Sequence, residues 1–112
     1  MNDLIVMKRF EIVVKLEHHD PLTELLKRSG ILGYTVMKSA GGLGAPGIRN
    51  PDDLLLPDEN TVTVFICNED LAQKMLDELR PAMKDFGGIC LITDCHAQTH
   101  SNYQGRTLQI SE

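Results

Sequence analysis

The order of hydrophobic patterns is the feature that most constrains what this chain can fold into. Residues Lys8 to Leu16 alternate between apolar and polar side chains, which predicts a strand with one buried face. Leucines on a single helical stripe come next. We expect their helix to begin at Asp20 and Pro21, as N-cap and first helical residue, and to end at Ser29–Gly30. The β-branched and aromatic segment Ile31 to Lys38 predicts a second strand.

The same patterns recur in the second half of the chain. Thr61 to Cys67, "TVTVFIC", predicts a third strand, and Asn68 is a good N-cap for a second helix with a regular apolar stripe. Pro81 should end or kink this helix, although apolar positions continue beyond it. After the turn at Gly87–Gly88, Ile89 to Asp94 predicts a fourth strand.

The predicted order β-α-β-β-α-β is the split βαβ, ferredoxin-like arrangement of the α+β class, in which two helices cover one face of the sheet. A single domain over residues 1–112 is expected at this length. Several apolar side chains fall out of phase with the main core positions. We therefore expect the second sheet face to be partly apolar and buried against other subunits. These residues are Val13, Phe65, Cys67, Cys90 and Ile92.

Composition argues against several classes of function. The net charge of -5 and the lack of a long basic run argue against general nucleic-acid binding, and three Phe, two Tyr and no Trp offer few platforms for base stacking. No stretch is apolar enough to span a membrane, and the N-terminal residues do not form a signal-peptide pattern. Three cysteines without a CxxC pair therefore predict a cytoplasmic protein with reduced thiols.

A glycine-rich segment, Ala40 to Asn60, separates the second and third predicted strands and is expected to be a loop. Four of the chain's nine glycines fall in its first half. Successive glycine N–H groups can form a concave nest for an anion. This makes Gly41–Gly42 and Gly87–Gly88 candidate phosphate-binding turns, with Arg49 as the one guanidinium in the loop. The pattern is neither a P-loop nor GxGxxG, and the alternative that these glycines only form turns stays open.

Several short motifs together resemble the PII signalling superfamily. These motifs are "GYTV", "SAGGLG", a long loop, the strand "VTVFI" and the turn and strand "GGIC", and they cover roughly residues 8 to 95. The similarity is greatest to the divergent PII-like branch, which includes the carboxysome-associated PII-like protein and the PII-like partner of a bicarbonate transporter. The resemblance implies a homotrimer with adenine nucleotides bound in clefts between subunits. It also implies that residues 40–60 correspond to the T-loop, which changes shape with ligand and contacts a partner protein.

The resemblance assigns roles to individual residues. Gly33 and Thr35 match the Gly-x-Thr motif that contacts the adenine, and Ile66 matches an apolar residue beside the base. Gly41 matches the glycine at the base of the T-loop, next to Gly42 in the predicted nest. Gly87 matches a glycine of the phosphate-binding turn.

The chain also departs from typical PII proteins. Gly88 stands where they carry a phosphate-binding lysine, and "CHAQTH" replaces their arginines after the last strand. This loss of positive charge favours ADP or AMP over ATP. The PII-like branch implies bicarbonate as an additional or alternative signal, and a small anion could sit in the Gly41–Gly42 nest near Arg49. We expect no tightly bound cofactor. The implied protein partner is a bicarbonate transporter or a carboxysome component.

Two other functions stay open. His96 and His100 are four residues apart and would share one face of a helix, where they could bind a transition metal. The segment lacks helical signals, however, and exposed histidines of a polar tail over residues 96–112 are the favoured explanation. The copper-tolerance proteins resemble PII in architecture, so a metal-binding trimer is the second candidate.

An enzyme is the third candidate and has the least support. Acylphosphatases share the predicted topology, but they need an arginine-bearing anion loop after the first strand, where this chain has "EHHDP". No Ser-His-Asp or Cys-His set has a recognisable spacing. We therefore expect a sensor and not a catalyst.

Overall fold

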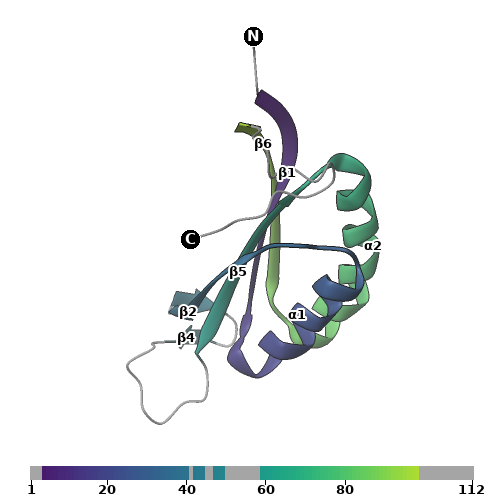
Figure 1. Ribbon diagram of the computed structural model, residues 1–112. Helices are drawn as coiled ribbons and strands as arrows, with labels where there is room; N and C mark the ends of the chain where they lie inside the picture. Colours follow the sequence, from purple (N-terminus) through teal and green to yellow (C-terminus); the bar gives the residue numbers. More distant parts are fainter. Residues whose placement is uncertain (1–3, 41, 45–46, 50–58, 99–112) are drawn as a thin grey trace.

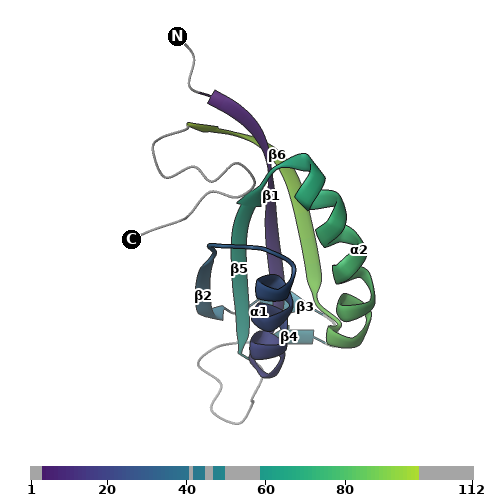
Figure 2. The ribbon, with the colours of Figure 1, turned by 45° about the vertical axis from the view of Figure 1, so that its right-hand side comes forward.

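The computed structural model describes residues 4–40, 42–44, 47–49 and 59–98 (Figure 1). Four long strands form one antiparallel sheet in the order β2-β5-β1-β6, and both helices cover the same face of it (Figures 1 and 2). The predicted ferredoxin-like order is therefore confirmed. The elements are β1 (Leu4–Lys15), the 3-10 turn η1 (Leu16–His18), α1 (His19–Arg28), β2 (Thr35–Ala40), β3 (Gly42–Gly44), β4 (Gly47–Arg49), β5 (Asn60–Cys67), α2 (Glu69–Phe86) and β6 (Ile89–Gln98).

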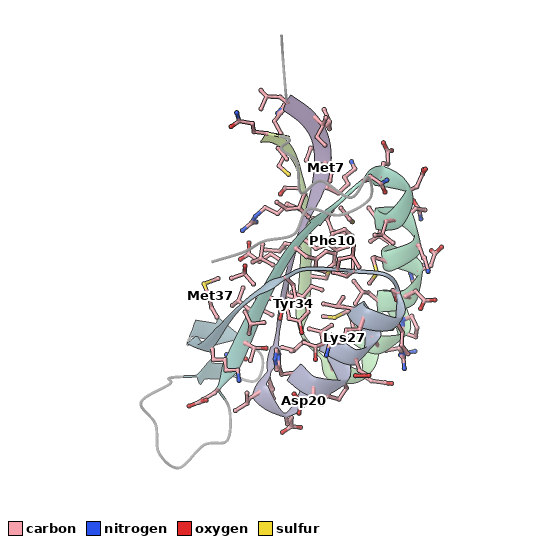
Figure 3. All side chains as sticks on the ribbon, in the orientation of Figure 1. Met7, Phe10, Asp20, Lys27, Tyr34 and Met37 are labelled. Atoms are coloured by element: carbon pink, nitrogen blue, oxygen red, sulfur yellow. The ribbon has the colours of Figure 1, made fainter. Side chains whose placement is uncertain are left out.

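The core lies between the sheet and the helices. Its centre is the stacked pair Phe10 and Phe65, whose ring centroids are 4.7 Å apart, and Figure 3 shows Phe10 pointing from β1 toward the helical layer. The predicted leucine stripes of both helices are buried against it, and each such side chain contributes about 2 kcal/mol. Asn68 caps α2 as predicted, since its Oδ1 accepts a hydrogen bond from the Leu71 N–H at 2.9 Å.

The assignment of residues to the second sheet face was wrong for four of its five members. Phe10 lies opposite Phe65 on one side and Ile92 on the other, and residues directly opposite each other share a face of an antiparallel sheet. Phe65 and Ile92 therefore point to the helices with Phe10. The four misassigned residues, all of which belong to or pack against the core, are Phe65, Cys67, Cys90 and Ile92.

The second face is nevertheless apolar, although different residues make it so. Met37, Ile89 and Leu91 are 52%, 56% and 51% exposed on it, and Figure 3 shows Met37 directed away from the helices. Half-buried apolar residues lie between them on the two central strands, and these are Val13, Val62, Val64 and Ile66. No described helix covers this face.

Strands β1 and β6 are longer than predicted. β1 begins at Leu4, and β6 continues to Gln98, because Leu4 and Gln98 are paired at the end of one continuous ladder. Met7 and Ala97 are buried in a small second cluster at this end of the sheet. The sequence Leu4–Met7 is apolar without alternation, so its pattern does not distinguish a strand from a helix.

Three other boundaries also differ. β2 begins at Thr35, and Ile31 packs into the core without joining the strand. α1 begins at His19, so Asp20 lies inside its first turn and is not the N-cap. The region predicted as a loop contains the β3–β4 hairpin, in which Gly42 pairs with Arg49.

Helix α2 passes through Pro81 and ends at Phe86, so of the two predicted effects of this proline, an end or a kink, the helix does not end there. Proline has no N–H, and the hydrogen bond that residue 81 would donate to the Asp77 carbonyl is missing. Apolar residues beyond it, Met83 and Phe86, pack against the core and hold the last turn in place. Packing here outweighs the lost hydrogen bond.

The turn at Gly87–Gly88 is tightly constrained. Gly87 ends α2 with a positive φ of 70°, and its N–H donates to the Met83 carbonyl at 2.8 Å. A Cβ on Gly88 would lie 2.1 Å from the Val13 carbonyl oxygen. The two glycines are therefore required for different reasons, one by its backbone angle and the other by the neighbouring strand.

This difference predicts unequal effects of the same substitution. Gly87→Ala should cost about 1 kcal/mol, since alanine resists the left-handed conformation but meets no atom within 4 Å. Gly88→Ala should cost about 3 kcal/mol, because the backbone must move away from β1. Urea unfolding of both variants measures the two losses, and equal losses would contradict the proposed close contact.

Candidate functional site

The predicted site residues lie at two edges of the sheet. The adenine-binding candidates Gly33 and Thr35 precede and open β2, which forms one edge. Thr35 pairs with Val64, and Ile66 is two residues further along β5 on the same face. All three candidates are half-buried. Thr35 and Ile66 thus share one face of the sheet on adjacent strands, and Gly33 lies two residues before Thr35; their role in adenine binding stays a prediction.

The Gly87–Gly88 turn leads into β6, which forms the opposite edge of the sheet. Strands β5 and β1 lie between the two edges, and three strand spacings amount to about 14 Å. One chain therefore does not bring the adenine-binding candidates and the glycine turn together. A ligand in contact with both sets must receive one of them from a neighbouring chain or extend across the sheet.

The base of the predicted T-loop lies at the same end of the sheet as the glycine turn. Asn60, the first residue of β5, pairs with Ala40 of β2 and Lys15 of β1, and Val13 of β1 pairs with Ile89 of β6. The ends of β1 and β2 therefore meet the beginnings of β5 and β6. Both views show the β3–β4 hairpin near this end, and Figure 1 shows β4 on the side away from the helices.

Gly42 of the anion-nest prediction and Arg49 both lie in this hairpin. Gly42 and Arg49 are directly opposed, and such residues have Cα atoms about 5 Å apart. Gly41 lies outside the described residues. Sequence reasoning missed this hairpin because glycine-rich strands show no alternation of side chains. The Pro46–Gly47 dipeptide is a turn signal between the two short strands.

The residues of the metal-binding alternative do not assemble in the part of the chain that is described. His96 is exposed in β6 opposite Val6, so it belongs to a strand and not to the tail as predicted. His100 lies outside the described residues. Within those residues, no group of three or more His, Cys, Asp or Glu side chains could hold a metal ion. Asp94 is engaged by Lys8, and this hydrogen bond raises the pKa of the Lys8 amino group.

The cysteine that follows the glycine turn, Cys90, is poorly suited to act as a nucleophile. Cys90 is half-buried beside the core, and burial raises the pKa of its thiol, which disfavours the thiolate form. The "EHHDP" segment, which stands where acylphosphatases have their anion loop, forms η1 and the start of α1.

Among the helices that the structure describes, none is long and apolar enough to cross a membrane.

Comparison with known proteins agrees with this fold. UPF0166 protein MJ1524 of Methanocaldococcus jannaschii is 30% identical over 97 residues, or 86% of each chain. CPII of Thiomonas intermedia K12, a nitrogen regulatory PII-like protein bound to ADP, AMP and bicarbonate, matches with a TM-score of 0.80 at 23% identity, covering 88% of this chain and 94% of CPII. CPII bound to ADP, AMP and acetate matches with a TM-score of 0.71 at 25% identity, covering 86% and 92%.

The family model described as "Nitrogen regulatory protein P-II" matches residues 7–100. That match takes in all four strands of the sheet, both helices and the glycine-rich segment between β2 and β5. The predicted resemblance is therefore confirmed at the level of the superfamily, and this chain belongs to the PII family.

Proposed function

We propose that this protein senses adenine nucleotides in clefts between neighbouring chains of a homotrimer, and that bicarbonate is its second signal. The observation that carries the proposal is the separation of the candidate residues. Gly33 and Thr35 lie at the β2 edge with Ile66 on the adjoining strand β5, and Gly87–Gly88 lies at the β6 edge. Placing the β2 edge of one chain beside the β6 edge of the next completes the site.

The apolar second face of the sheet supports association of chains. Met37, Ile89 and Leu91 are each about half exposed on that face, and monomeric proteins rarely leave a patch of this kind uncovered. A closed trimer would bury the face around its axis and would bring unlike sheet edges together. The same assembly thus covers the apolar surface and forms the nucleotide cleft.

The chemistry of the glycine turn favours ligands with few phosphates. Gly88 has no room for a side chain, so this position can offer a ligand its main chain but no ammonium group. A diphosphate or monophosphate needs less compensating positive charge than a triphosphate. ADP and AMP are the nucleotides bound to the related CPII, which supports this preference.

Bicarbonate would act at the base of the T-loop, residues 40–60. Gly42 and Arg49 lie opposite each other in the β3–β4 hairpin, and a guanidinium can hold a planar carboxylate-like anion with two hydrogen bonds. CPII has been observed with bicarbonate, which supports this ligand. The loop would relay ligand state to a protein partner in inorganic-carbon metabolism, such as a bicarbonate transporter or a carboxysome component.

Isothermal titration with ADP, AMP and ATP, each with and without bicarbonate, tests the ligand proposal. We expect one site per chain, tighter binding of ADP and AMP than of ATP, and affinities that change when bicarbonate is present. The reason for the nucleotide preference is the missing positive charge at Gly88. If no nucleotide produces saturable heat, the sensor proposal fails, and copper and zinc become the ligands to titrate.

Removing the Arg49 guanidinium should abolish the bicarbonate response. Arg49→Ala is expected to weaken the effect of bicarbonate at least about 10-fold, since a charge-assisted hydrogen bond contributes more than about 1.4 kcal/mol. Arg80→Ala, which removes an exposed arginine from α2, is the matched control. An Arg49→Ala protein that responds to bicarbonate as the parent does would overturn the proposed anion site.

A charge on the apolar sheet face should prevent assembly without unfolding the chain. Leu91→Glu is expected to convert the trimer into a monomer, because Leu91 is 51% exposed in the single chain but would be buried in the assembly. Light scattering coupled to size exclusion measures the mass, and circular dichroism checks the fold. Val6→Glu, at a 64% exposed position on the other face of the sheet, should remain trimeric. A trimeric Leu91→Glu protein would contradict this interface.

A further inference from the structure

The short turn η1 contacts both ends of the proposed signalling path. On one side, the Leu16 N–H donates a hydrogen bond to the Glu59 carbonyl at 2.7 Å. Glu59 is the residue immediately before β5, where the T-loop segment returns to the sheet. On the other side, the His18 imidazole stacks on the Phe86 ring, with centroids 4.9 Å apart and planes 20° from parallel. Phe86 is the last residue of α2 and directly precedes the Gly87–Gly88 turn.

The position of the His18 ring is defined by its surroundings. Its Nε2 lies 3.5 Å from a Glu17 carboxylate oxygen, and the side chain is only 26% exposed. Stacked aromatic rings contribute beyond the apolar area that they bury. The ring therefore forms a specific contact with Phe86 and is not a solvated surface group.

The last turn of α2 depends on this contact more than an ordinary helix end would. Pro81 removes one hydrogen bond from the last part of the helix, so side-chain packing must hold the residues beyond it. Phe86 packs on the core on one side and on His18 on the other. The Gly87 N–H bond to Met83 closes the same turn. Greater mobility of the Phe86 side chain would therefore make the backbone of the Gly87–Gly88 turn more mobile.

We propose that His18 is a positioning residue for the Gly87–Gly88 turn, and that η1 couples ligand binding at this turn to Glu59 at the base of the T-loop. The coupling part rests on the proposed function. A ligand bound at the turn acts on Phe86, and the His18 ring stacked on Phe86 transmits this effect to η1. The hydrogen bond from Leu16 to Glu59 then changes the conformational preference at the start of β5. By thermodynamic linkage, a conformational change in the loop alters ligand binding at the turn by the same free energy.

Amide hydrogen exchange of the nucleotide-free protein, followed by NMR, tests the positioning step without any ligand. His18→Ala should speed exchange at the Gly87 amide, which is bonded to Met83. His18→Phe keeps a ring against Phe86 and should restore slow exchange. His96→Ala, the same change at an exposed strand position, should leave Gly87 as in the parent. Unchanged exchange at Gly87 in His18→Ala would refute the positioning role, and so would failure of His18→Phe to rescue it.

A double-mutant cycle separates the specific contact from general destabilisation. Phe86→Leu keeps apolar bulk but removes the ring, and it should speed Gly87 exchange as His18→Ala does. The double variant should be little worse than either single variant, because both remove the same contact. Additive effects would mean that His18 and Phe86 act independently, which contradicts the proposal. Urea unfolding of each variant shows how much of the change in exchange is global.

The coupling step is tested by adding ADP. In the parent, ADP should slow exchange at the Leu16 amide, and His18→Ala should lose this protection and bind ADP about 5-fold more weakly. Equal protection of Leu16 in both proteins would overturn the coupling. If the parent does not bind ADP, the nucleotide-sensor proposal fails, while the nucleotide-free exchange still decides the role of His18 in the turn.

Discussion

Backbone pairing along β1 is the constraint on which the rest of the structure depends. β1 is hydrogen-bonded to β5 from Lys8 to Lys15 and to β6 from Leu4 to Val13, so both neighbours take their register from it. That register places Phe10 opposite Phe65 and Ile92, and thereby decides which side chains meet the helices. A shift of one residue in either ladder would exchange the core face and the outer face.

The same pairing determines where ligand chemistry is possible. With β1 and β5 in the centre, β2 and β6 become the edges, and the candidate adenine-binding and phosphate-binding residues are divided between them. The proposed association through the apolar face and the proposed nucleotide site at the edges therefore both depend on one strand order. The β1 end also carries η1, which explains how a three-residue turn reaches both the Glu59 carbonyl and the Phe86 ring.

The sequence was sufficient for the order of elements, because alternation and helical stripes are strong in β1, β5 and both helices, and Asn68 capped α2 as expected. The face of the sheet that each strand residue occupies was harder to predict. β5 and β6 carry apolar residues on both faces, so Phe65 and Cys90 could not be assigned without their partners on β1. The β3–β4 hairpin had no side-chain pattern to reveal it. The roles of Gly33, Thr35 and Ile66 stay predictions, since a site completed by a second chain leaves no complete signature in one.

The close contact at Gly88 also has an evolutionary consequence. Any residue with a Cβ would collide with the Val13 carbonyl, so a mutation to lysine or arginine would disturb the end of the sheet before its charge could serve a ligand. Positive charge for a ligand of the proposed site would therefore have to come from other positions, such as the hairpin that contains Arg49. The steric restriction leaves the turn little freedom to change, so divergence among descendants of this chain should concentrate around it and not within it.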